Sequence, residues 1–120
     1  MTRREIDRRL KVGESPASIS AREWRRLASV KNLPNWYAIG IGTCALCAVH
    51  LLGDYRDGTP EKLCRRCPLG VVNKAMSGRA ACGVEPGTLW GDANDARKSG
   101  NLADFRAAAT KLADVLEVLK

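Results

Sequence analysis

The sequence is poor in aromatic residues and in histidine, and it lacks any long apolar run. It has three Trp, two Tyr, one Phe and a single His in 120 residues. The first ten residues contain no apolar run, so we expect no secretory signal, and no stretch approaches the roughly 20 apolar residues of a membrane-spanning helix. We therefore expect an intracellular protein that has no membrane partner.

Motifs that build catalytic sites are also missing. There is no nucleophile-elbow serine and no P-loop for phosphate binding. Cys47 and His50 are close enough in sequence to suggest a thiol nucleophile and its base, but Cys47 is better explained as a metal ligand. A ligated thiolate is a poor nucleophile, so we expect a protein that is not an enzyme and has no small-molecule substrate.

The sequence does contain five cysteines. Persistent disulfides are rare in a reducing compartment, and an odd count leaves one thiol unpaired. Cys44-Ala-Leu-Cys47 and Cys64-Arg-Arg-Cys67 are two C-x-x-C pairs separated by sixteen residues, a spacing typical of tetrahedral Cys₄ zinc sites. We predict one Zn²⁺ per chain in a closed structural site, bound by Cys44, Cys47, Cys64 and Cys67.

Other ligands and another metal group remain open at this point. Cys82 precedes a glycine that eases the approach of backbone amides to a thiolate, and His50 lies three residues after Cys47, so both are substitute ligands. Cys82 is explained better as a buried thiol packed in the core. The Cys67-Pro68 pair is similar to the end of iron–sulfur loops, although the compact run of four cysteines is absent. A redox C-x-x-C is disfavoured because the chain has no βαβ pattern.

The cysteine pattern resembles that of a group of small uncharacterised proteins encoded by tailed phages and prophages. The specific part is C-x-L-C, then C-x-x-C-P-L, then a single Cys, and the resemblance covers roughly residues 36–119. It implies a phage accessory protein with a metal knuckle. It carries over no catalytic residue, and residues 1–35 lie outside it.

The positive charge is concentrated near the N-terminus. The net charge is +7, and residues 1–35 contribute +5 of it, with nine Lys and Arg against four Asp and Glu. This asymmetry predicts an acidic partner, and phosphate contacts give affinity without sequence information. We predict a nucleic acid or a nucleoprotein complex as the partner. The residues predicted to contact it are Arg3, Arg4, Arg8, Arg9, Lys11, Arg22, Arg25, Arg26, Arg65 and Arg66.

A function of a different class also fits the sequence. Trp24, Trp36 and Trp90 are candidate anchors of a protein–protein interface, although burial in the core explains them as well. The chain would then be an adaptor or inhibitor that binds a host defence or transcription protein, or a phage protein. Salt dependence separates the two functions, because phosphate binding weakens steeply with salt and an apolar interface barely responds.

The N-terminal half shows two signals for helix starts. Thr2 with Glu5 forms a capping box, which predicts a short polar helix near residues 3–11. Ser20 with Glu23 forms a second one, which predicts a helix over residues 21–33 that ends before Pro34. We expect the segment from Gly13 to Pro16 to separate these helices, and residues 36–42 to form a short strand or a packed turn.

The C-terminal half has clearer helical periodicity. Pro68 suits the first position of a helix that runs to about residue 76, and two more helices are expected over 88–99 and from 102 to the C-terminus. The fold class predicted is mainly α, with three to four helices around a zinc-bound irregular knuckle segment. Residues 1–17 are predicted as a basic arm or short helix, and residues 18–120 as one zinc-stabilised helical domain.

Overall fold

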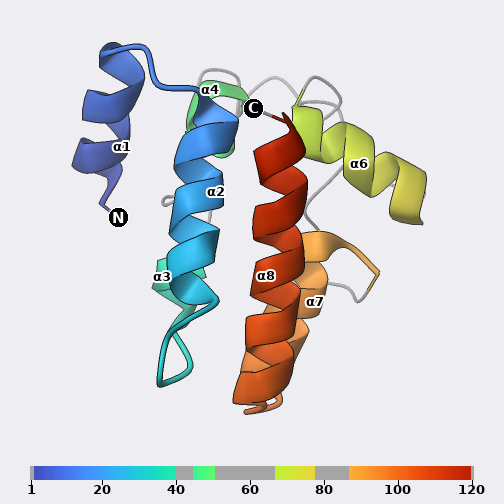
Figure 1. The fold of residues 1–120 in the computed structure, drawn as a ribbon. Helices are drawn as coiled ribbons and strands as arrows, with labels where there is room; N and C mark the ends of the chain where they lie inside the picture. The colour runs from blue at the N-terminus through green and yellow to red at the C-terminus, as the bar shows by residue number, and fades with distance from the viewer. Residues whose placement is uncertain (1, 40–44, 51–66, 78–86, 120) are drawn as a thin grey trace.

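The computed structural model describes residues 2–39, 45–50, 67–77 and 87–119, and Figure 1 shows how their helices are arranged. The described residues form helices and no strand, which confirms the mainly α prediction. Five of the helical elements have nine residues or more, so the described part alone exceeds the three to four helices expected. The elements are α1 (Arg3–Lys11), α2 (Pro16–Leu27), α3 (Trp36–Ile39), α4 (Ala45–His50), α6 (Pro68–Ser77), α7 (Leu89–Lys98) and α8 (Leu102–Leu119).

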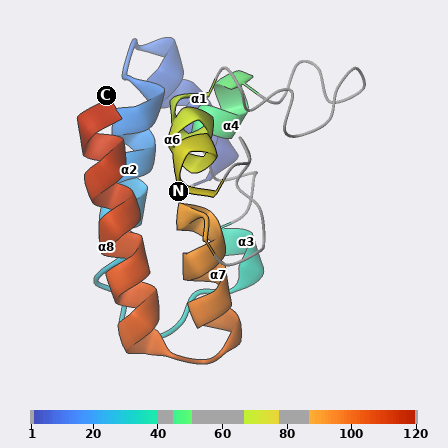
Figure 2. The ribbon, with the colours of Figure 1, turned by 90° about the vertical axis from the view of Figure 1, so that its right-hand side faces the viewer.

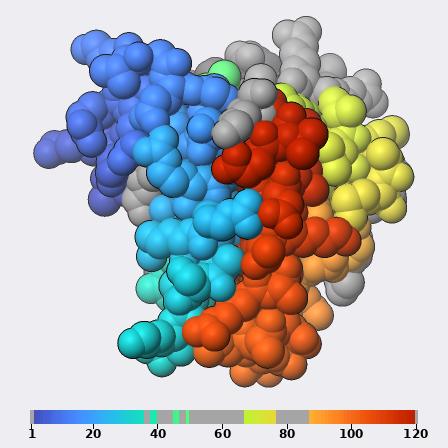
Figure 3. Space-filling view, viewed as in Figure 1, coloured from blue at the N-terminus to red at the C-terminus, as the bar shows by residue number. Residues whose placement is uncertain are grey.

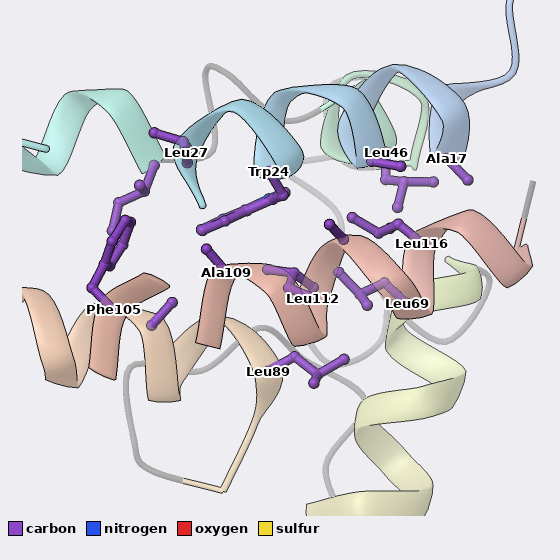
Figure 4. Close-up of a cluster of buried hydrophobic side chains, with 14 of the residues drawn as sticks. Ala17, Trp24, Leu27, Leu46, Leu69, Leu89, Phe105, Ala109, Leu112 and Leu116 are labelled. Carbon is purple, nitrogen blue, oxygen red and sulfur yellow. The ribbon is translucent and has the colours of Figure 1, made fainter. Parts of the chain in front are cut away.

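The centre of the molecule is the packing of α8 against α2 on one side and α7 on another (Figures 1 and 2). Helical spacing places Phe105, Ala109, Leu112 and Leu116 on one stripe of α8, and all four are buried. Trp24 of α2 faces Phe105 with ring centroids 6.5 Å apart, and Figure 4 shows both rings inside the cluster. With few rings available, the core is filled mainly by leucine and alanine.

Local sequence signals set the ends of α7 and α8 as predicted. The Thr88 hydroxyl accepts a hydrogen bond from the Gly91 amide (2.9 Å), and the Asn101 side chain accepts one from the Asp104 amide (3.0 Å). Each satisfies an amide in the first turn that has no partner within the helix. Gly100 between the two helices has φ +74°, a conformation that favours glycine. α6 also begins at Pro68 as expected.

The predicted bounds of α2 were wrong at both ends. The helix begins at Pro16, with Ser15 as its cap accepting from the Ser18 amide (3.4 Å), so the segment expected as a break opens the helix. Ser20 lies inside α2 and is buried. The helix ends at Leu27 and not near Leu33, and the Val30 carbonyl that follows accepts a hydrogen bond from Arg106 Nε (2.8 Å) of α8.

Residues 36–39 form the short helix α3, where a strand or packed turn was expected. Its first turn is capped by Asn35, whose side chain accepts a hydrogen bond from the Ala38 amide (3.0 Å). Trp90 of α7 donates its indole N–H to the Ile39 carbonyl (2.7 Å), which fixes α3 against α7. Trp90 therefore has a structural hydrogen bond, and Trp24 is buried in the core; the side chain of Trp36 lies outside the description.

The helix α1 is docked through a second, smaller hydrophobic cluster. Ile6 is fully buried together with Ile19 of α2 and Ala45 of α4, and Leu10 packs beside them. Thr2 caps α1 by accepting from the Glu5 amide (3.2 Å), as predicted. The boundary predicted at residue 17 falls within α2, and the division into an arm and a domain stays a prediction.

Candidate metal centre and basic surface

The predicted zinc ligands fall only partly within the described residues. Cys44, Cys64 and Cys82 lie outside them, and Cys47 and His50 are described as positions on α4 but not in their side chains. Cys67 is the predicted ligand whose surroundings are described. Among the described residues, no group of three or more His, Cys, Asp or Glu side chains is arranged to hold a metal ion.

Cys67 lies immediately before α6 and is buried in the main core. Its carbonyl accepts a hydrogen bond from the Val71 amide (3.1 Å), the first hydrogen bond of the helix, so Cys67 occupies the cap position. The fold therefore places Cys67 at the start of α6, within the same core cluster as Leu46 of α4.

The helix that contains the first C-x-x-C pair is fixed to α2. The Ser20 hydroxyl accepts a hydrogen bond from the Ala45 amide (3.2 Å), at the residue that follows Cys44. Leu46, between Cys44 and Cys47, is buried in the same hydrophobic cluster as Cys67 and Leu69. Figure 4 shows Leu46 of α4 and Leu69 of α6 beside the C-terminal half of α8. The fold thus attaches parts of both C-x-x-C pairs to one core.

Five of the predicted basic residues are engaged in ion pairs with acidic residues of the same chain. Arg3 pairs with Asp7 (2.9 Å) and Arg25 with Asp114 (2.8 Å). The others are Arg9, which pairs with Glu5 and Glu14, Arg22, which pairs with Glu14, and Arg26, which pairs with Glu23. In each pair the carboxylate offsets the positive charge that a phosphate would otherwise meet.

The ion pair between Arg26 and Glu23 differs from the others because its carboxylate is buried. The Glu23 side chain is 8% exposed, and it accepts hydrogen bonds from Arg26 Nη2 (2.6 Å) and Nε (3.3 Å). Burial raises the pKa of Glu23, but hydrogen bonds and attraction from cationic groups, Arg26 among them, outweigh it and leave the pKa below its usual value. Removing Arg26 would leave a buried carboxylate without that partner, so Arg26 has a structural role.

Glu14 joins α1 to α2. Its carboxylate accepts hydrogen bonds from Arg9 Nη1 of α1 (3.4 Å) and from Arg22 of α2. The hydrogen bond from Arg22 is the largest influence on Glu14, and it holds the pKa of that carboxyl below its usual value despite partial desolvation. This residue was not singled out from the sequence, because its two partners lie on different helices.

The remaining described cations of the predicted set are exposed and form no ion pair within the described residues. They are Arg4, Arg8 and Lys11 of α1. We refer to these three residues as the basic stripe. Arg65 and Arg66 lie outside the described residues, so their relation to this surface stays a prediction.

Comparison with known proteins adds no family or fold assignment. No protein-family model matches the chain, and no curated protein or solved structure shows significant similarity to it. Within the described residues, no helix combines the length and hydropathy needed to cross a membrane.

Proposed function

We propose that this chain is a non-enzymatic zinc-binding accessory protein that binds nucleic acid or a nucleoprotein complex through its basic N-terminal surface. We also propose that it is phage-encoded, on the strength of the cysteine pattern that resembles such proteins. The observation that supports the partner best is the set of exposed cations Arg4, Arg8 and Lys11, which form no ion pair in the described part of the chain.

The zinc part of the proposal rests on ligand chemistry and on the placement of Cys67. Four thiolates from two C-x-x-C pairs suit the tetrahedral preference of Zn²⁺, and a closed site leaves no open position for catalysis. Cys67 is buried at the start of α6, and the segment after Cys44 is fixed to α2 by the hydrogen bond to Ser20. Zinc binding would join these segments and compensate for a core that has few large rings.

Metal analysis of anaerobically purified protein tests this part. We expect one zinc per chain and a colourless solution, whereas an iron–sulfur protein is brown. Cys44→Ser and Cys64→Ser should abolish metal binding, and Cys82→Ser is the matched control that should retain it. If Cys82→Ser loses the metal while one of the other four cysteines can be replaced without loss, the assignment of ligands is wrong.

The nucleic-acid part is tested by direct binding at several salt concentrations. Full-length protein should bind labelled nucleic acid at 50 mM salt, and its affinity should decrease linearly on a plot of log affinity against log salt concentration. An acidic polypeptide such as poly-glutamate serves as a control for unspecific attraction to negative charge. If the protein binds neither single- nor double-stranded nucleic acid at 50 mM salt, the proposal fails and a protein partner takes its place.

A further inference from the structure

The face of α1 that is exposed to solvent follows from the face that is buried. An α-helix turns about 100° per residue, which places Arg4, Arg8 and Lys11 within an arc of roughly 60°. Ile6, the residue that α1 buries, lies on the opposite side by the same geometry, and it is fully covered. Figures 1 and 3 show α1 at the edge of the molecule.

The spacing of the basic stripe suits a run of phosphates. The rise of 1.5 Å per residue separates Arg4 from Arg8 by about 6 Å and Arg4 from Lys11 by about 10 Å along the helix axis. Successive phosphates on one strand of a duplex are separated by a few ångströms along its axis, so the stripe spans two to three of them. Arg3 and Arg9 flank this arc, but both are engaged in ion pairs on α1 or with Glu14.

We propose that the basic stripe on the outer face of α1 is the nucleic-acid contact, and that it binds the phosphate backbone of a duplex without reading its sequence. This inference rests on the proposed function, and it limits the nucleic-acid contact to three of the residues predicted for it. The arginines of α2 are excluded from the primary contact because Arg22, Arg25 and Arg26 are bound to Glu14, Asp114 and Glu23.

A duplex is favoured over a single strand because it presents a regular run of phosphates at the spacing of the basic stripe, and the described aromatic side chains add no stacking surface to the stripe. Proteins that bind single strands without sequence preference stack bases on aromatic side chains. Among the aromatic side chains that the structure describes, Trp24 and Phe105 are buried and Trp90 is half-buried with its N–H bonded to Ile39. The basic stripe instead offers charge alone, which matches a phosphate backbone.

The proposal predicts a shallow salt dependence. Three phosphate contacts give a slope near −2.7 in log affinity against log salt for duplex DNA, or about a 40-fold loss between 50 and 200 mM. Contacts from all eight described residues of the predicted set would give a slope near −7. The slope of log affinity against log salt therefore distinguishes contact by the basic stripe alone from contact by all eight described residues of the predicted set.

The test compares two triple variants of the full-length protein that remove the same charge. The first is Arg4→Gln, Arg8→Gln and Lys11→Gln. The matched control replaces three other cations by glutamine: Arg3 and Arg25, which are ion-paired, and Lys111 on the exposed side of α8. Substitution is used instead of deletion of residues 1–12, because deletion would also remove Ile6 from its cluster with Ala45. Circular dichroism confirms that both variants keep their helices.

We expect the stripe variant to lose about tenfold in affinity per cation at 50 mM salt, and its salt slope to fall close to zero. The control variant should keep the wild-type slope, and wild-type protein should bind a duplex more tightly than a single strand of the same length. Equal losses in both variants, a larger loss in the control, or a preference for single strands would overturn this inference while the proposed function stands. Failure of the wild-type protein to bind any nucleic acid would overturn both.

Discussion

Replacing Ile6 by alanine tests how α1 is held to the rest of the protein. Ile6 is fully buried with Ile19 and Ala45, and truncating such a side chain costs about 2–5 kcal/mol. The other attachments of α1 include the ion pairs through Glu14, which join partly solvated side chains and stabilise less than a fully buried aliphatic side chain does. A nine-residue helix is also marginal in water without packing. We therefore expect α1 to undock and lose its helical structure in Ile6→Ala.

Native-state hydrogen exchange measures this local opening. A loss of about 2 kcal/mol in docking corresponds to about 30-fold faster exchange of the amides of α1. The amides of α8 should change much less, because its buried stripe packs in the other hydrophobic cluster. Val12→Ala is the matched control, since Val12 is 76% exposed at the end of the same helix.

The variant also links α1 to the proposed metal site. Ala45 shares the small cluster with Ile6 and belongs to α4, the helix that contains Cys47. If zinc binds there, Ile6→Ala should lower the zinc affinity, and Val12→Ala should leave it unchanged. Exchange of the α1 amides at the same rate in Ile6→Ala and in wild-type protein would refute the reasoning, because the buried side chain would then contribute nothing to docking.

Two further predictions follow from the core and from the acidic residue between α1 and α2. Leu112→Ala should lower the free energy of unfolding by about 2–5 kcal/mol in a urea titration, because Leu112 is fully buried, while Lys111→Ala on the exposed side should change it little. Glu14 has a lowered pKa, so the stabilisation it gives is present above its usual pKa of 4.5 and is lost as the pH falls through the lowered value. The protection factors of the α1 amides, which correct for the pH dependence of chemical exchange, should therefore decrease below about pH 4.5 in wild-type protein. Glu14→Gln should lack the part of this decrease that Glu14 causes. Identical pH profiles of the two proteins would contradict the role of Glu14.

Much of the local structure was predictable because its causes lie within a few residues of each other. Thr2, Thr88 and Asn101 cap their helices through side chains that reach amides two or three residues ahead, and the sequence displays such pairs directly. The buried apolar side of α8 could be predicted for the same reason, because helical periodicity repeats over a short distance in the sequence. The ion pairs of Arg3 with Asp7 and of Arg26 with Glu23 have the spacing of neighbours on a helix.

The errors occurred where a distant segment competes for the backbone. A capping box predicted a helix start at Ser20, but the hydroxyl of Ser20 is bonded to Ala45, which lies 25 residues later. The predicted continuation of α2 to residue 33 does not form, and the Val30 carbonyl is instead bonded to Arg106, 76 residues away. Local propensity cannot reveal such partners, because they become neighbours only when the helices pack.

The division of the basic residues into ion-paired and exposed groups likewise depends on segments that are distant in sequence. The amino-acid sequence by itself determined the excess of positive charge near the N-terminus, the two C-x-x-C pairs and the helical character of the chain. Only the tertiary structure decided that Arg25 meets Asp114, 89 residues away, and that burial of Ile6 directs Arg4, Arg8 and Lys11 to solvent. Charge is a property of composition, whereas its availability to a partner depends on which helix faces are buried and which acids the packing brings close.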